Sequence, residues 1–200
     1  MKFLMSKKSS NKIYSLIYRR LHWILAGIII ALLIFGQNFH REISDSYRIW
    51  GLKAHSTLGT MALVVGCVFI FRRFVLRRPT PDHKLPLFKL LMARAVQLGL
   101  YSMAIFVPVS GMICAIYHHY PVGFLGFIDI SAFVPDNEES YLFFRQAHVW
   151  ATRLTMLMLA GHAGAALWHH FVVKDGVLKS MLANDPLVDK LLQKFKLRKI

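Results

Sequence analysis

Four long runs of apolar residues are separated by shorter polar segments. They cover residues 21–39, 55–76, 95–117 and 149–173. Each run is close to the roughly 20 helical residues that cross the hydrocarbon core of a bilayer, which is about 30 Å thick. Because backbone groups in lipid must satisfy their hydrogen bonds within the protein, each run is expected to be a helix. The pattern therefore predicts an all-α membrane protein built on a bundle of four transmembrane helices.

The distribution of charge indicates how this bundle is oriented. The 200 residues are 56% hydrophobic, which is high for a soluble domain, yet they carry a formal net charge of +15. A basic chain could bind nucleic acid, but most of its basic residues precede the first run, join the second to the third, or follow the fourth. The positive-inside rule places such segments in the cytoplasm. We therefore expect both termini to be cytoplasmic, the lipid bilayer to be a partner, and nucleic acid not to be one.

Two further segments are not expected to span the membrane. Residues 118–147 form a loop on the outer side that is rich in aromatic residues and poor in basic ones. Residues 184–199 are predicted to form a short amphipathic helix on the inner leaflet, with Asp185 as its N-cap and apolar residues along one face. This organisation gives a four-helix transmembrane domain over residues 1–182 and a cytoplasmic amphipathic tail over residues 183–200.

Six of the ten histidines lie in loops or near the ends of the spans, which leaves His22, His55, His148 and His162 as candidates. A histidine at a helix end is often an ordinary polar residue at the membrane surface, and this alternative holds for each of the first three taken singly. His162 is different, because 14 positions at 1.5 Å each place it about 21 Å deeper than His148 along the same helix. An ionisable residue at that depth is a candidate for function.

Depth and helix direction limit which histidines can meet. His148 and His162 return to within about 40° of each other around their helix, so they share one face. His22 lies near the inner end of the first span and can meet only His162. His55 lies at the outer start of the second span and can meet only His148. The sequence thus predicts two histidine pairs, one toward each side of the membrane.

Two facing imidazoles in a helix bundle are the axial ligand set of a haem iron. Zinc usually takes four ligands, and no cysteine or carboxylate is placed to complete such a set. A proton relay would use acidic residues within the spans, which contain none. Small residues beside the histidines would leave room for a flat macrocycle, although close helix packing also selects small residues. These small residues are Ala26, Gly27, Gly59, Gly161 and residues 163–166.

Three basic residues are further candidates for cofactor binding. Arg153 lies one to two turns inside His148, where a haem propionate or interfacial water could solvate its charge. Arg19 and its basic neighbours at the inner face could bind propionates, or the phosphates of lipids. Lys53 precedes His55 by two residues and is the best-placed basic residue on the outer side.

The order and spacing of several motifs resemble the bacterial cytochrome b561 family over roughly residues 14–182. The most specific is GHAGAALWHHFVVKDGVL at 161–178, and RRLHW at 19–23, HSTLG at 55–59 and PVSG at 108–111 accompany it. The resemblance implies a protein of the bacterial inner membrane with two haem b groups, one bound by His22 and His162 and the other by His55 and His148. It also implies electron exchange with ubiquinone.

Relatives in that family oxidise superoxide, so the resemblance implies a superoxide:ubiquinone oxidoreductase-like enzyme that carries electrons from the periplasm to the quinone pool. Lys53 would then help to attract superoxide to the outer haem. An alternative is a haem-bearing membrane anchor that links a periplasmic redox protein to the quinone pool, since acidic residues in the outer loops suit a basic protein donor. A haem-free channel or transporter is a third possibility, and its purified protein would be colourless.

Overall fold

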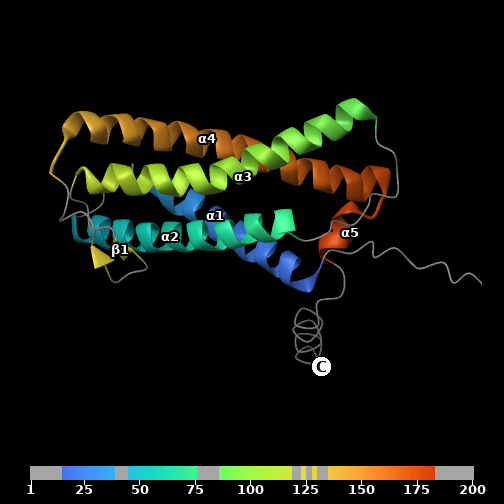
Figure 1. The fold of residues 1–200 in the computed structure, drawn as a ribbon, viewed down its shortest axis with the longest axis horizontal. Coiled ribbons are helices and arrows are strands. Elements are labelled where there is room, and N and C mark those ends of the chain that lie inside the picture. Colours follow the sequence, from blue (N-terminus) through green and yellow to red (C-terminus); the bar gives the residue numbers. More distant parts are fainter. Residues whose placement is uncertain are drawn as a thin grey trace, which may run out of the picture.

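The computed structural model describes residues 15–38, 45–75, 86–118, 123–124, 128–129 and 135–182. Within them the chain forms long helices joined by short connections, with a small pair of strands before the last long helix (Figure 1). In chain order the elements are α1 (Leu16–Asn38), α2 (Asp45–Val75), α3 (Leu87–Ile116), β1 (Gly123–Phe124), β2 (Ile128–Asp129), α4 (Glu138–Trp168), the π-helix η2 (His169–Val173) and α5 (Val177–Leu182).

The four long helices are each long and apolar enough to cross a membrane. They alternate in direction, and each packs along the next in the chain, α1 on α2, α2 on α3 and α3 on α4 (Figure 1). The predicted four-span helical membrane bundle is therefore confirmed. The start of α1 and the short helix α5 lie at the same end of the bundle, where the Trp23 indole donates a hydrogen bond to the Met181 carbonyl (3.1 Å).

All four long helices begin earlier than their apolar runs. Helix α2 begins at Asp45 rather than near His55, so Lys53 is helical and does not lie in a loop. Helix α4 begins at Glu138, where the Asn137 side chain accepts a hydrogen bond from the Ser140 amide (2.9 Å). Such a cap satisfies one of the amides that a helix leaves open at its start. The apolar run marks the part of a helix in hydrocarbon, and capping decides where the helix itself begins.

The connection from α3 to α4 is closed by backbone and aromatic contacts. The Asn137 amide donates to the Tyr117 carbonyl (3.3 Å), and the Tyr117 ring stacks on Phe144. Between them, β1 and β2 pair antiparallel. The predicted amphipathic helix at 184–199 lies outside the described residues.

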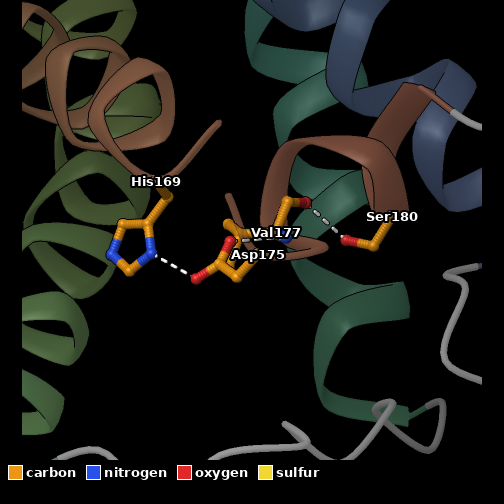
Figure 2. Close-up of polar contacts among 4 residues, drawn as sticks. All are labelled: His169, Asp175, Val177 and Ser180. Atoms are coloured by element: carbon orange, nitrogen blue, oxygen red, sulfur yellow. Dashed lines mark hydrogen bonds and ion pairs between the residues drawn. The ribbon is translucent and has the colours of Figure 1, made fainter. Parts of the chain in front are cut away.

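At its other end α4 continues into the π-helix η2 and then turns sharply into α5. The turn uses Lys174, whose φ of 57° is left-handed, and Asp175, which lies close to His169 (Figure 2). The Asp175 carboxylate accepts from His169 Nδ1 (2.5 Å) and from the Val177 amide (3.0 Å), so one side chain joins the first residue of η2 to the first residue of α5.

The buried apolar core lies mainly between α1 and α2. It contains Tyr18, Leu25, Ala62 and Phe69, and the Tyr18 and Phe69 rings stack with centroids 4.7 Å apart. Most other large apolar side chains face outward, as a lipid-embedded bundle requires.

Candidate functional site: two facing histidine pairs

The first pair of histidines joins α1 to α4. The rings of His22 and His162 have centroids 6.2 Å apart and planes inclined at 42°. Edge contacts from Trp23 (5.1 Å) and Phe69 (6.0 Å) hold the His22 ring on its other sides. We call this end of the bundle, which also carries α5, the His162 end.

The second pair joins α2 to α4 at the opposite end, here called the His148 end. The rings of His55 and His148 have centroids 6.4 Å apart and planes inclined at 80°. Helix α4 thus contributes one histidine to each pair, and the about 21 Å rise between His148 and His162 separates the pairs along the bundle. The structure brings together the same two pairs that depth along the helices predicted.

Both separations fit an iron ion between the rings. Metal–nitrogen bonds to imidazole are about 2.0–2.1 Å, and each donor nitrogen lies about 1.1 Å from its ring centre, so two imidazoles that face each other across one ion have ring centres about 6.3 Å apart. Two nitrogen donors suit a haem, whose porphyrin supplies the other four. No cluster of three or more His, Cys, Asp or Glu side chains suited to a metal ion occurs in the described part of the chain, which argues against a zinc-type site there.

Several glycines near the paired histidines face open space, and three of them lie at the exposed surface of their helices. A Cβ atom added to Gly27, Gly59, Gly161 or Gly164 would meet nothing within 4 Å. Close packing against a neighbouring helix therefore does not explain these small residues, which was the alternative to a cofactor slot. Their positions suit a flat ring held by the histidines.

Two other glycines lie against the paired histidines. A Cβ at Gly111 would lie 2.9 Å from His148 Cε1, closer than real side chains approach, and one at Gly36 would lie 3.7 Å from His55 Cε1. His148 Nδ1 also lies 2.9 Å from the Val107 carbonyl oxygen. Sequence reasoning missed Val107, although the nearby Pro108 and Gly111 were visible in the PVSG motif.

Two arginines at the His162 end are buried in the protein. Arg19 is 6% exposed and Arg73 is 7% exposed. Arg73 Nε donates to the Tyr101 hydroxyl (3.0 Å), and its Nη2 lies 3.5 Å from Gln97 Oε1. Arg19 Nε and Arg73 Nη1 have no hydrogen-bond partner among the described residues. Burial of this degree favours an anion within the bundle, such as a haem propionate, over the phosphate of a surrounding lipid.

Comparison with known proteins agrees with this geometry. The family model described as prokaryotic cytochrome b561 matches residues 13–184. The chain belongs to the prokaryotic cytochrome b561 family. Cytochrome b561 homolog 2 of Escherichia coli strain K12 is 26% identical over 181 residues, covering 89% of this chain and 95% of that protein. Cytochrome b562 of Cereibacter sphaeroides is 30% identical over 179 residues, covering 84% of this chain and 94% of that protein.

Membership of the cytochrome b561 family makes this chain a multi-pass membrane protein that transfers electrons through haem b. The family thus excludes the haem-free channel or transporter.

Two predicted cofactor-binding residues of this cytochrome lie beside tryptophan rings. The Arg153 guanidinium lies over the Trp150 ring, 4.8 Å from its centroid, and Lys53 Nζ lies 5.5 Å from the centroid of a Trp50 ring. All four side chains are exposed. Contacts of a cation with tryptophan are common where a helix crosses the membrane surface, and for Arg153 they favour the interfacial alternative. A role of either residue in cofactor binding stays a prediction.

Proposed function

We propose that this protein carries electrons one at a time across the bacterial inner membrane, from a periplasmic donor to ubiquinone, through two haem b groups. His22 and His162 would bind one haem, and His55 and His148 the other. The observation that carries the proposal is the pair of ring separations, 6.2 and 6.4 Å, at two ends of one bundle. When bound, haem b supplies one-electron chemistry at its iron.

The protein's own residues orient this chemistry and tune its charge. Helix α4 fixes the spacing of the two sites, because it holds a histidine of each. Arg19 and Arg73 place two buried positive charges at the His162 end, where they would neutralise propionates. The positive-inside rule, applied to the basic segments before the first apolar run, between the second and third, and after the fourth, favours a cytoplasmic His162 end and a periplasmic His148 end.

Superoxide is the favoured donor at the His148 end. Arg48, Lys53 and Arg145 are exposed there, and exposed cations attract a small anion by long-range electrostatics. Ubiquinone would accept electrons at the His162 end, in two successive one-electron transfers.

One observation supports a second candidate, a haem-bearing membrane anchor that takes electrons from a periplasmic redox protein. Asp136, Glu138 and Glu139 are exposed at the start of α4, on the same side as the exposed cations. A basic protein would dock against such a group of carboxylates. The two candidates share the haem sites and differ only in the donor.

Haem content and visible spectra test the sites. Purified protein should contain two haems per chain and show a b-type α band when dithionite reduces it. His22→Ala or His162→Ala should remove one haem, and His55→Ala or His148→Ala the other, whereas exposed His118→Ala should keep both. Two haems remaining in any of the four paired variants would contradict the ligand assignment.

Stopped-flow mixing with superoxide tests the donor. With ubiquinone present, superoxide should reduce the haems, and the haems should then reduce the quinone. Quinone reduction should be faster with the protein than with superoxide in buffer alone. High ionic strength should slow the haem reduction, because salt screens the exposed cations. No acceleration over buffer, with both haems in place, would exclude superoxide and leave a protein donor.

A further inference from the structure

His148 is held in place by contacts with helix α3. His148 Nδ1 lies 2.9 Å from the Val107 carbonyl oxygen of α3 and 3.4 Å from Ser110 Oγ. Ser110 is almost fully buried, and its hydroxyl donates to the same carbonyl (2.9 Å). The His148 ring also packs against Gly111, where an added Cβ atom would lie within 3.0 Å of two ring atoms of His148. The segment Val107–Gly111 therefore forms a cradle around one imidazole.

This cradle decides which ring nitrogen carries the proton. A carbonyl oxygen only accepts hydrogen bonds, so Nδ1 of His148 must be the donor in the 2.9 Å contact. The lone pair then lies on Nε2, which is free to bind a metal. In the other pair, His22 Nδ1 is buried and has no hydrogen-bond partner in the described residues.

The difference has a consequence for redox potential. An imidazole whose N–H donates to a carbonyl becomes a more basic ligand. A more basic axial ligand stabilises ferric iron more than ferrous iron and lowers the reduction potential, because second-shell hydrogen bonds tune haem potentials. This effect is available to the His148 end and is absent from His22.

We propose that the Val107–Gly111 cradle positions His148 and gives the haem at the His148 end the lower potential of the two, so that electrons run downhill toward the His162 end. The inference rests on the proposed pair of haems and adds a direction to it. One electron leaves ferrous iron at the His148 end and reduces ferric iron at the His162 end, with no proton or leaving group involved. This direction matches a donor on the side of His148.

Potentiometric titration of the α band tests the ordering. Wild-type protein should titrate with two midpoints. His22→Ala, which keeps only the haem of the His148 end, should titrate near the lower midpoint, and His55→Ala should titrate near the higher one. The reverse assignment, or equal midpoints, would overturn the proposal. Purified wild-type protein that contains no haem would instead overturn the proposed function.

A glycine substitution tests the cause. Gly111→Ala should push the His148 ring away from the Val107 carbonyl. At a fixed potential it should raise the ratio of reduced to oxidised His148-end haem on the order of tenfold. This change corresponds to a rise of about 59 mV in the midpoint potential of a one-electron couple. The matched control is Gly99→Ala on the same helix, where the added methyl meets only the flexible end of Met158.

Each outcome of this second experiment decides the role of the cradle. The positioning role is supported if Gly111→Ala raises only the lower midpoint potential, or loses only the haem with that midpoint, while Gly99→Ala behaves like wild type. An unchanged lower midpoint, a fall, or an equal shift of both midpoints overturns it. Low-temperature EPR of the ferric protein gives an independent readout, since only the low-spin signal of the His148-end haem should change.

Discussion

Tyr101→Phe removes one oxygen atom from the interior of the bundle and should destabilise the protein measurably. The Tyr101 hydroxyl accepts a hydrogen bond from Arg73 Nε at 3.0 Å, and Arg73 is 7% exposed. The Tyr101 ring also packs edge-on against Phe69, with centroids 6.0 Å apart, and phenylalanine retains that contact. The substitution therefore isolates the hydrogen bond to a buried charge.

The magnitude follows from the kind of hydrogen bond that is lost. A hydrogen bond to a charged group contributes about 1.5–3 kcal/mol, and a buried charge left without its partner costs at least as much. Arg73 has a weak alternative in Gln97 Oε1 at 3.5 Å, so we expect a loss near the middle of this range. At about 2–4 °C per kcal/mol for a chain of this length, the Tm should fall by roughly 5–9 °C.

The assay is thermal unfolding in one detergent, followed by circular dichroism at 222 nm at a single scan rate. Tyr117→Phe is the matched control, because the Tyr117 ring stacks on Phe144 and its hydroxyl has no hydrogen-bond partner among the described residues. Combining Tyr101→Phe with Arg73→Leu supplies the second control. A Tm loss no larger than that of Tyr117→Phe, or an equal loss in the Arg73→Leu background, would refute the reasoning.

Three other substitutions test separate features. Asp175→Asn weakens the contact with His169. It should speed amide hydrogen exchange in α5 but not in the four long helices. Unchanged exchange in α5 would show that this contact does not hold α5 in place. Asn137→Ala removes the cap of α4 and should cost about 1 kcal/mol, seen as a lower Tm and faster exchange in the first turn. Gly59→Leu should fill the open space beside the His148-end pair and leave one haem per chain, while Gly176→Leu, also in open space, should leave two. Two haems in both leucine variants would place the macrocycle elsewhere.

The spans and the histidine pairs could be predicted because both depend on simple distances. An apolar run of about 20 residues must be a helix in lipid, and helical rise then assigns each histidine a depth. Depth alone excluded pairing His22 with His148 or His55 with His162. The helix ends could not be predicted in this way, because caps such as Asn137 lie outside the apolar runs.

The surroundings of the histidines depended on information that the sequence pattern does not carry. Any residue has a carbonyl, so nothing in the side chain of Val107 marks it as the partner of His148. A charge near a span end is equally ambiguous. Arg19 lies within one turn of the membrane surface by sequence, and only packing shows that it points into the bundle while Arg153 points out.

Helix α4 explains how one bundle can hold two cofactors at a fixed spacing. Its stretch from His148 to His162 contains no proline, and the π-helical turn η2 starts only at His169, beyond the second ligand. The regular helix therefore keeps both imidazoles on one face, since 14 positions bring the chain almost back to its starting angle. The facing histidines His22 and His55 come from α1 and α2, two separate helices that pack on each other. In the proposed function, a single helix would thus set the spacing of the two haems, and the neighbours of each histidine could tune its site without changing the distance that electrons cross.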